Sequence, residues 1–224
     1  MTNLQLSPPE AARELLARRI ARRHLLPFTK YTYPRYQPEL FHRFLADALN
    51  DVVEGNCNRL MVLAPPQHGK SELVSVRLPA YWFGRRPDDP VILTSYAASL
   101  AHSKSRQARE VVESPSFKAL FPNVTTSRTS RAVDNWTLAD HRGELVAAGV
   151  GGPITGHGAL LGIIDDPFEN YAQAESATVR ENVWQWYRST LRTRVWEDGA
   201  IVLVLTRWHE DDLAGRLLKA QPGQ

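Results

Sequence analysis

Five short apolar runs recur along the chain, separated by segments of helical periodicity or by turns. The runs span residues 59–63 (RLMVL), 90–96 (PVILTSY), 144–149 (ELVAAG), 159–166 (ALLGIIDD) and 200–205 (AIVLVL). Apolar runs of this length, rich in β-branched residues, predict buried strands. Strands that alternate with helices favour βαβ units, so the pattern predicts an α/β fold with a mostly parallel central β-sheet flanked by helices.

Segments of helical periodicity fill most of the intervals between these runs. They span residues 1–30, 39–54, 71–83, 97–113, 176–195 and 210–218. The second has a continuous apolar face, and in the first the sequence SPPE favours a helix start. Residues 31–37 are expected to be extended, whereas residues 114–135 are turn-rich and predict no clear order of elements.

The first predicted helix is rich in arginine, and its arginines alternate with leucine and isoleucine. These basic side chains could contact DNA phosphates or a neighbouring subunit. They could also form the solvated face of an amphipathic helix, and this simpler interpretation is favoured.

Composition limits the class of protein. With 224 residues and 43% hydrophobic content, the chain can form one large domain or two small ones with a packed core. A net charge of +3 and a pI of about 9.1 allow a basic face but no strong overall basic field. The single cysteine, Cys57, excludes an internal disulfide. Because no apolar run could span a membrane and no signal sequence is recognisable, we expect a soluble, intracellular protein.

Residues 64–71 (APPQHGKS), which we call the phosphate loop, follow the first apolar run and precede a helical segment. A strand, a Gly-Lys-Ser loop and a helix form the Walker A arrangement, in which backbone N–H groups and a helix N-terminus hold a triphosphate. Lys70 is expected to reach the β- and γ-phosphates and Ser71 to ligate Mg²⁺. The predicted nucleotide-binding residues here are Ala64, Pro65, Pro66, Gln67, His68, Gly69, Lys70, Ser71 and Glu72.

The phosphate loop departs from the motif in two ways. Ala64 stands where the motif has its first glycine. Pro65 and Pro66 carry no N–H, so the donors must come mainly from Gln67 to Ser71. A chance Gly-Lys-Ser behind an apolar run is the alternative interpretation.

The run at 159–166 ends in two aspartates, which is the Walker B pattern. Asp165 is expected to support the Mg²⁺ shell behind Ser71. Asp166 is expected to act as the general base on the attacking water. Glu169 is the alternative base, because Asp166 is one methylene shorter than the glutamate that many such ATPases have. Two aspartates after a strand could also be a turn or a helix cap, but the pairing with Gly-Lys-Ser favours ATP and Mg²⁺ as cofactors.

Residues ahead of the phosphate loop are candidates for adenine recognition. Gln37 or His42 could bind the polar edge of the base, and Tyr36 or Phe41 could stack on it. For each of the four, a turn residue or a core aromatic is an alternative that is at least as well supported.

Two further segments could respond to the γ-phosphate. Residues 149–158 (GVGGPITGHG), which we call the glycine loop, contain five glycines and predict positive φ angles or close approach to another group. Their position before the acidic strand favours a switch or nucleotide-sensing loop over a plain surface turn. Thr206 and Arg207 follow the last strand, at the edge where open α/β sheets bind ligands, and are candidate sensor or coupling residues.

The order of these motifs resembles the N-terminal ATPase domain of the large terminase subunit of tailed bacteriophages, over nearly the whole chain. The segments that carry the resemblance are APPQHGKSE, SYAASLAHSKSRQAR, GVGGPITGHGA, IIDDPFEN, VWQWY and LTRWHEDDLAGRLL. The resemblance implies a P-loop ATPase of the additional-strand (ASCE) type, a motor that hydrolyses ATP to drive double-stranded DNA into a procapsid.

The resemblance also implies a domain organisation. Residues 1–58 would be an N-terminal, adenine-side segment packed on the core, and residues 59–219 the ATPase core. Residues 220–224 would start a linker to a C-terminal nuclease domain of RNase H-like fold with an acidic two-metal site. Because the sequence holds no such domain, we expect an isolated motor domain without nuclease activity.

The partners implied by the resemblance are double-stranded DNA, the portal protein and the small terminase subunit. The chain would form a homo-oligomeric ring, a pentamer, on the portal and be a monomer when isolated, with no membrane partner. It would act in the cytoplasm of the infected host cell, transiently on the procapsid, and be absent from the mature virion.

Ring ATPases of this kind use an arginine finger from the neighbouring subunit, which stabilises charge on the transferring phosphate. Arg142 is the candidate here, with Arg131 and Arg106 as alternatives. A surface salt bridge of little energetic consequence is the structural alternative for each.

Two other functions share the same motifs. One is a different DNA-dependent ATPase, such as a helicase-like translocase. The other is a nucleotide-binding scaffold with little turnover, which Ala64 favours and the presence of Lys70, Ser71 and Asp165 opposes.

Overall fold

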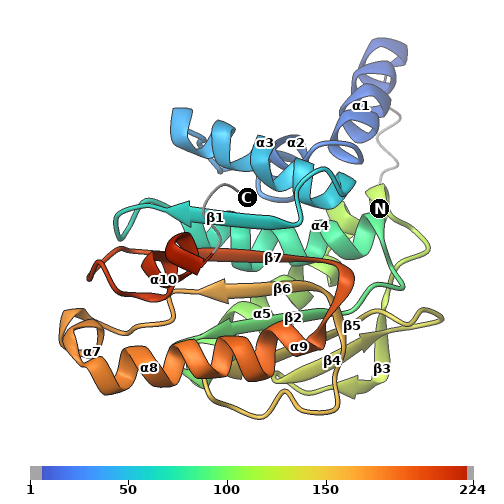
Figure 1. Cartoon of the computed structure of the whole chain (residues 1–224). Helices are drawn as coiled ribbons and strands as arrows, with labels where there is room; N and C mark the ends of the chain where they lie inside the picture. Colours follow the sequence, from blue (N-terminus) through green and yellow to red (C-terminus); the bar gives the residue numbers. More distant parts are fainter. Residues whose placement is uncertain (1–6, 221–224) are drawn as a thin grey trace.

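A seven-stranded sheet forms the centre of the protein in a computed structural model, which describes residues 7–220 (Figure 1). The strands are β1 Arg59–Leu63, β2 Val91–Ser95, β3 Thr126–Arg131, β4 Asn135–Leu138, β5 Glu144–Gly149, β6 Ala159–Asp165 and β7 Val195–Leu205. Their spatial order is β1-β7-β6-β2-β5-β4-β3. The first five strands in this order are parallel, and β4 and β3 continue the sheet antiparallel. The predicted α/β fold with a mostly parallel sheet is confirmed.

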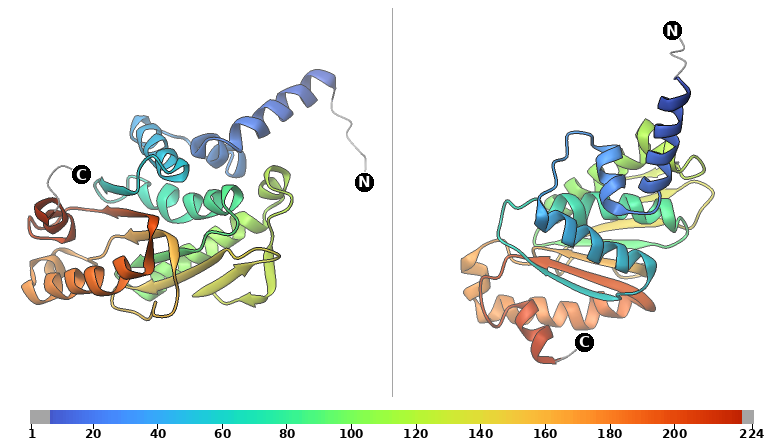
Figure 2. Two further views of the ribbon diagram at one scale, coloured as in Figure 1. Left: turned by 45° about the vertical axis from the view of Figure 1, so that its right-hand side comes forward. Right: turned by 90° about the horizontal axis from the view of Figure 1, so that it is seen from above.

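Helices flank the sheet on both faces. They are α1 Pro8–Ala21, α2 Leu25–Thr32, α3 Leu40–Glu54, α4 Leu78–Arg85, α5 Ala98–Glu113, α6 Pro115–Leu120, α7 Tyr171–Glu175, α8 Ala177–Trp186, α9 Arg192–Arg194 and α10 Leu213–Ala220, with π-helical turns η1 Glu72–Arg77 and η2 Tyr187–Leu191. The two views of Figure 2 show α1 projecting from the body, and α3 and α4 on the face opposite α8.

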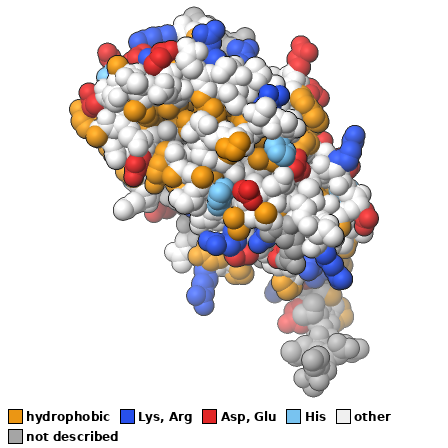
Figure 3. Space-filling view, turned by 90° about the horizontal axis from the view of Figure 1, so that it is seen from below, with side chains coloured by type: hydrophobic (Ala, Val, Ile, Leu, Met, Phe, Trp, Pro, Cys, Tyr) orange, Lys and Arg blue, Asp and Glu red, His pale blue; other side chains and the backbone are white. Residues whose placement is uncertain are grey.

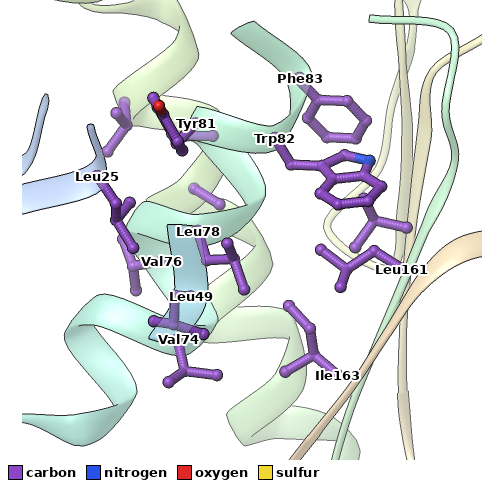
Figure 4. Close-up of a cluster of buried hydrophobic side chains, with 14 of the residues drawn as sticks. Leu25, Leu49, Val74, Val76, Leu78, Tyr81, Trp82, Phe83, Leu161 and Ile163 are labelled. Atoms are coloured by element: carbon purple, nitrogen blue, oxygen red, sulfur yellow. The ribbon is translucent and has the colours of Figure 1, made fainter. Parts of the chain in front are cut away.

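Successive residues of the parallel strands point to two separate cores. On β2, Val91 and Leu93 join a core with α3, α4 and α5, whereas Ile92 joins a second core with α8. Figure 4 shows part of the first core, where Trp82 of α4 lies beside Leu161 of β6. Each large side chain buried in this way stabilises the fold by about 1.5–3 kcal/mol. Burial on both faces explains why these strands are nearly continuous apolar runs.

One strand intervenes between the strand that precedes the phosphate loop and the strand that carries the aspartates. β7 pairs with β1 on one side and with β6 on the other, which is the additional strand that the resemblance implies. The register aligns Leu63 with Leu205 and Asp165 with Val204. Because the strands are parallel, the residues that follow β1, β6 and β7 share one edge of the sheet.

The N-terminal segment is not the single helix predicted over residues 1–30. A turn at residues 22–24 separates α1 from α2. Leu25 and Phe28 are fully buried in the first core, and the Leu25 N–H donates to Asn50 Oδ1 at 2.9 Å. Docking of α2 on the core therefore turns the chain, which the helical periodicity alone could not indicate.

Helix α3 joins the same core as the sheet. Leu45, Leu49, Val52 and Val53 are buried there. The predicted domain boundary at residue 58 stays a prediction. Residues 1–6 and 221–224, which include most of the predicted linker, lie outside the described residues.

Three further segments differ in detail from their predictions. Residues 114–135 contain α6 and β3 and reach the start of β4. The predicted helix 176–195 is divided into α8, η2 and α9, and β7 already begins at Val195. The predicted helix 71–83 contains the π-helical η1, and the wide turn ends just before Pro79, which has no N–H to donate. No helix within residues 7–220 has the length and hydropathy needed to cross a bilayer.

Candidate functional site

The phosphate loop leaves the end of β1 and turns sharply into η1. Gln67 and Gly69 have positive φ angles of 62° and 69°. Ala64 is buried, and its N–H donates to Leu205 O at 3.3 Å, so the start of the loop is fixed to β7. The remaining positions up to Gly69 are exposed. An exposed loop that leads into a helix N-terminus suits the binding of an anion by backbone N–H groups.

Lys70 bridges the ends of three strands. The residue is only 4% exposed, and its Nζ donates to Thr206 Oγ1 at 2.8 Å. The same Nζ forms an ion pair with Asp166 Oδ2 at 3.0 Å. The Thr206 hydroxyl in turn donates to Ala64 O at 3.3 Å. The loop lysine, the second aspartate and the end of β7 therefore form one polar cluster.

Asp165, at the end of β6, is 2% exposed and has both carboxylate oxygens bonded. Ser71 Oγ donates to Oδ1 at 3.0 Å, and Ser75 Oγ donates to Oδ2 at 2.6 Å. Burial raises the pKa of Asp165 above its ordinary value, and the neighbouring Asp166 adds to the rise. The two hydroxyls and Lys104 act in the opposite direction.

Ser71 and Asp165 fit a Mg²⁺ ion. This hard cation takes oxygen ligands and usually keeps several waters and substrate phosphates in its shell. A buried carboxylate whose pKa is raised by burial is one whose charge a cation would stabilise. No group of three or more His, Cys, Asp or Glu side chains within residues 7–220 could hold a metal ion by itself.

Asp166 is held by hydrogen bonds in an uncommon backbone conformation. Its φ is 47°, its N–H donates to Val204 O at 2.8 Å, and its carbonyl accepts the Tyr96 N–H at 3.1 Å. Its Oδ1 accepts the Thr206 N–H at 2.8 Å. A non-glycine residue in the left-handed region costs about 1–3 kcal/mol and often marks a functional site.

Glu169 lies close to Asp166 in sequence but has a different environment. It is exposed, and its Oε2 accepts a hydrogen bond from Gln173 Nε2 at 2.9 Å. Within the described residues, no hydrogen bond or ion pair joins Glu169 to the phosphate loop. The choice between Asp166 and Glu169 as the base stays a prediction.

Of the three candidate arginine fingers, Arg142 lies away from the phosphate loop of its own chain. Arg142 is exposed in the turn before β5, where its N–H donates to Asp88 Oδ1 at 2.9 Å. That turn is at the amino edge of the parallel strands, opposite the phosphate loop. Arg106 is exposed on α5, and Arg131 is the last residue of β3. A role of any of them in a neighbouring subunit stays a prediction.

Thr206 and Arg207 have different partners. Thr206 belongs to the polar cluster around Lys70, but Arg207 Nε pairs with Asp212 Oδ2 at 2.9 Å. Asp212 is fully buried, and its Oδ1 accepts the Gly215 N–H at 2.9 Å in the first turn of α10. Arg207 thus stabilises the start of α10 in this structure, and its predicted sensor role stays a prediction.

Of the adenine candidates, His42 contacts the phosphate loop. Its Nε2 lies 3.0 Å from His68 O. The rings of Tyr36 and Phe41 pack edge-on against His42, with centroids 5.7 and 5.5 Å away. Gln37 is exposed. Base recognition by these residues stays a prediction.

Glu72, the first residue of η1, is paired within its own segment. Its Oε1 accepts from Arg77 Nε at 2.7 Å, and the Arg77 guanidinium lies 5.1 Å from the centroid of the Tyr33 ring. Burial raises the pKa of Tyr36 to about 12, and Glu72 adds to this shift. The predicted contact of Glu72 with the nucleotide stays a prediction.

The glycine loop crosses from the end of β5 back to the start of β6. Gly151 and Gly156 have positive φ angles of 80° and 93°, as its composition predicts. Ile154 is fully buried in the second core. A Cβ on Gly149 would lie 2.9 Å from Ala98 N, so the start of α5 packs directly on this glycine. The loop lines a hollow of about 580 Å³, and its switch role stays a prediction.

The face of the molecule on the α8 side shows no continuous basic stripe. In Figure 3, hydrophobic side chains occupy much of the centre of this face, and lysines and arginines are scattered mostly toward its edges.

Ser75 is a site residue that the sequence analysis missed. A serine four positions after Ser71 lies on the same side of a helix, so the spacing could have indicated it. Its hydroxyl fills the second hydrogen-bonding position of Asp165.

Comparison with known proteins identifies relatives at the level of family and fold. Residues 61–222 match the family model described as terminase large subunit, T4likevirus-type, N-terminal. The fold is similar to the crystal structure of the large terminase of bacteriophage HK97, with a TM-score of 0.57 and 15% sequence identity. The similarity covers 84% of this chain but only 38% of the HK97 chain. At this identity the likeness shows the fold alone. No curated protein sequence matches the chain.

Proposed function

The chain belongs to the T4likevirus-type family of terminase large subunits, and from this membership we propose that it is the ATPase motor domain of a viral genome-packaging terminase. It would hydrolyse ATP to ADP and phosphate and use the energy to translocate double-stranded DNA into a procapsid. Its partners would be the portal protein, the small terminase subunit and further copies of itself in a ring.

The observation that carries the proposal is the meeting of two motifs that lie far apart in the sequence. Ser71 Oγ is 3.0 Å from Asp165 Oδ1, and Lys70 Nζ is 3.0 Å from Asp166 Oδ2. These are the residue pairs that a magnesium nucleotide needs together: a lysine for the phosphates, and a hydroxyl with a carboxylate for the metal. The parallel strand order supports the proposal, because it brings the two motifs to one edge of the sheet.

Each residue of the cluster has a task in this mechanism. Lys70 exchanges part of its interaction with Asp166 for the β- and γ-phosphates. Asp166, with its Oδ1 still fixed by the Thr206 N–H, orients a water molecule and accepts its proton as the oxygen attacks the γ-phosphorus. The bond from that phosphorus to the ADP oxygen breaks in the same step. Ser71 and Asp165 would hold Mg²⁺, which when bound neutralises charge on the phosphate oxygens.

An ATP turnover assay tests the proposal. Phosphate release would be measured for the wild-type chain, for Lys70→Ala and for a matched control, Lys219→Ala, at an exposed position of α10. Each protein would be assayed with and without double-stranded DNA, at low and at high protein concentration. We expect Lys70→Ala to lose at least about a hundredfold in kcat/KM, because removal of one charged phosphate contact in a preorganised site costs about 3 kcal/mol or more. Lys219→Ala should match the wild type.

The other outcomes separate the competing functions. Binding of ATP without turnover under every condition would indicate a nucleotide-binding scaffold. Separation of a forked duplex would indicate a helicase-like translocase. Equal activity of the wild type and Lys70→Ala would reject the phosphate loop as the site.

A further inference from the structure

Residues 65–69 of the phosphate loop make few contacts with the rest of the protein. Residues 65–69 are exposed, and two of them are prolines without an N–H. Within the described residues, the side chain of His42 is the one side chain from outside the loop that bonds to this stretch. It comes from the first turn of α3, which precedes the loop in sequence and packs on the core through Leu45 and Leu49, further along the same face.

The hydrogen bonds of His42 fix which ring nitrogen carries the proton. Nδ1 accepts the backbone N–H of Glu39 at 3.0 Å, so Nδ1 is unprotonated. Nε2 then carries the proton and donates to His68 O, also at 3.0 Å. His68 continues the chain of bonds, because its Nδ1 lies 2.8 Å from Pro66 O. The N-terminus of α3 is thereby linked through one imidazole to the turn that precedes Lys70.

The contact is close as well as polar. A Cβ on Gly69 would lie 2.8 Å from His42 Nε2, so the imidazole packs directly against the loop backbone. Gly69 has a φ of 69°, which suits glycine, and it immediately precedes Lys70. The rings of Tyr36 and Phe41 both pack edge-on against the imidazole.

We propose that His42 is a positioning residue that holds residues 65–69 in the shape that receives phosphates, and that it acts independently of the base. The proposal rests on the proposed nucleotide-binding function and names one determinant of it. Without the imidazole, the loop would spend part of its time in other conformations, and the apparent affinity for every ligand that carries a triphosphate would fall by the same factor.

This role predicts a pattern that base recognition would not give. Loss of the His42 contact with the phosphate loop should weaken the binding of MgATP, MgGTP and magnesium tripolyphosphate equally, because all three present the same phosphates. Loss of an adenine contact should weaken MgATP alone. Substitution of His42 should also change KM more than kcat, because the imidazole prepares the loop for binding and touches no reacting atom.

The experiment compares four variants by calorimetric titration and by steady-state turnover of ATP. His42→Phe keeps a ring against Tyr36 but removes both hydrogen bonds. His42→Gln restores one acceptor and one donor. Arg43→Ala is the control at an exposed neighbouring position, and Gln37→Ala tests the other adenine candidate.

We expect His42→Phe to weaken all three ligands about five- to thirtyfold, the loss of one or two ordinary hydrogen bonds, with little change in kcat. His42→Gln should recover much of the affinity, and Arg43→Ala should match the wild type. Thermal unfolding without ligand would be measured in parallel. A merely structural defect in His42→Phe would lower the midpoint temperature of unfolding, and His42→Gln would then not regain ligand affinity.

Three results would overturn the proposal: a loss confined to MgATP, an unchanged affinity in His42→Phe, or a loss that Gln does not relieve. Failure of nucleotide binding itself would look different, because the wild-type chain would then bind none of the three ligands. Binding of all three ligands without turnover would reject ATP hydrolysis, and the titrations alone would then decide the role of His42.

Discussion

Asp166 and Glu169 are two acidic residues near the same strand end, yet their surroundings prepare them for different tasks. Asp166 is anchored by the Thr206 N–H and by Lys70, whereas Glu169 is exposed and bonded to Gln173. A general base must be held within reach of the water that it activates. We therefore expect Asp166→Asn to lower kcat by about a hundredfold or more and Glu169→Gln to change it less than about threefold.

Single-turnover measurements with saturating ATP would provide the test, because they report chemistry separately from product release. Binding of ATP by Asp166→Asn should persist, which shows that the variant is folded. A large loss in Glu169→Gln with a normal rate in Asp166→Asn would assign the base to Glu169 instead.

Ser75 is the hydroxyl donor to one of the two carboxylate oxygens of the buried Asp165. Ser75→Ala would leave Asp165 Oδ2 without its 2.6 Å donor in a position that is 2% exposed. We expect a loss of about 1–3 kcal/mol in the free energy of unfolding, the cost of an unsatisfied buried acceptor. Urea denaturation measures it, and Ser189→Ala, at an exposed helical serine, should stay within about 0.5 kcal/mol of the wild type. Equal stability of the two variants would contradict this role.

The sequence was most informative at the residue scale where chemistry is local. Lys70 and Ser71 are adjacent, and Asp165 and Asp166 end an apolar run, so both motifs could be recognised without a structure. The contact of His42 with the phosphate loop could not, because it joins residues 26 positions apart through a turn whose shape the sequence does not state.

At the scale of elements, prediction succeeded where burial on both faces leaves a continuous apolar run. The strands β1, β2, β5 and β6 begin and end within a residue or two of their predictions. Prediction failed where tertiary contacts decide, as at the turn between α1 and α2, which the burial of Leu25 imposes. The strand β3 is polar throughout, and β4 has only four residues, in which buried Trp136 and Leu138 alternate with polar residues, so neither strand forms a continuous apolar run.

The contact between α8 and the segment before α10 predicts a pH dependence of stability. Asp211 pairs with Arg216 at 2.9 Å and with Arg180 at 3.4 Å. The hydrogen bond from Arg216 is the largest cause of a pKa of Asp211 below its ordinary value. A carboxyl group with a lowered pKa in the folded state stabilises the fold above its unfolded-state pKa, and this contribution is lost as the pH falls through the folded-state value.

We therefore expect Asp211→Asn to be less stable than the wild type at neutral pH, by less than about 1 kcal/mol because the pair is partly exposed. The difference should shrink as the pH is lowered below the ordinary value of an aspartate, for as long as both proteins remain folded. Urea denaturation in steps from neutral to acidic pH measures it. A difference that grows toward acid would contradict the argument.

At the scale of the whole molecule, the strand order is what turns separate motifs into a site. The insertion of β7 between β1 and β6 places Thr206 between the phosphate loop and the aspartates, where it bonds to both Lys70 and Asp166. The alternation of strands and helices predicted a parallel sheet but not this order, since many orders satisfy the same pattern. The resemblance of the motifs implied the additional strand, and the structure shows that this strand places Thr206 beside Lys70 and Asp166.

The position of Arg142 at the amino edge of the sheet leads to a prediction about assembly. An arginine so far from the phosphate loop of its own chain can act as a finger only on a neighbouring copy, and such a finger is worth about 10³–10⁵ in kcat. We expect Arg142→Ala to lose the part of the turnover that rises with protein concentration, while its affinity for ATP stays unchanged.

A mixing experiment tests whether the arginine acts between subunits. Lys70→Ala subunits cannot hydrolyse ATP but retain Arg142. When they are added to the Arg142→Ala protein, they should restore turnover in a concentration-dependent way. Lys70→Ala subunits that also carry Arg142→Ala should restore nothing, and Arg106→Ala serves as the parallel variant for the alternative finger. If the turnover of Arg142→Ala rises with protein concentration as steeply as that of the wild type, Arg142 is not the finger. The same prediction would then apply to Arg106 or Arg131.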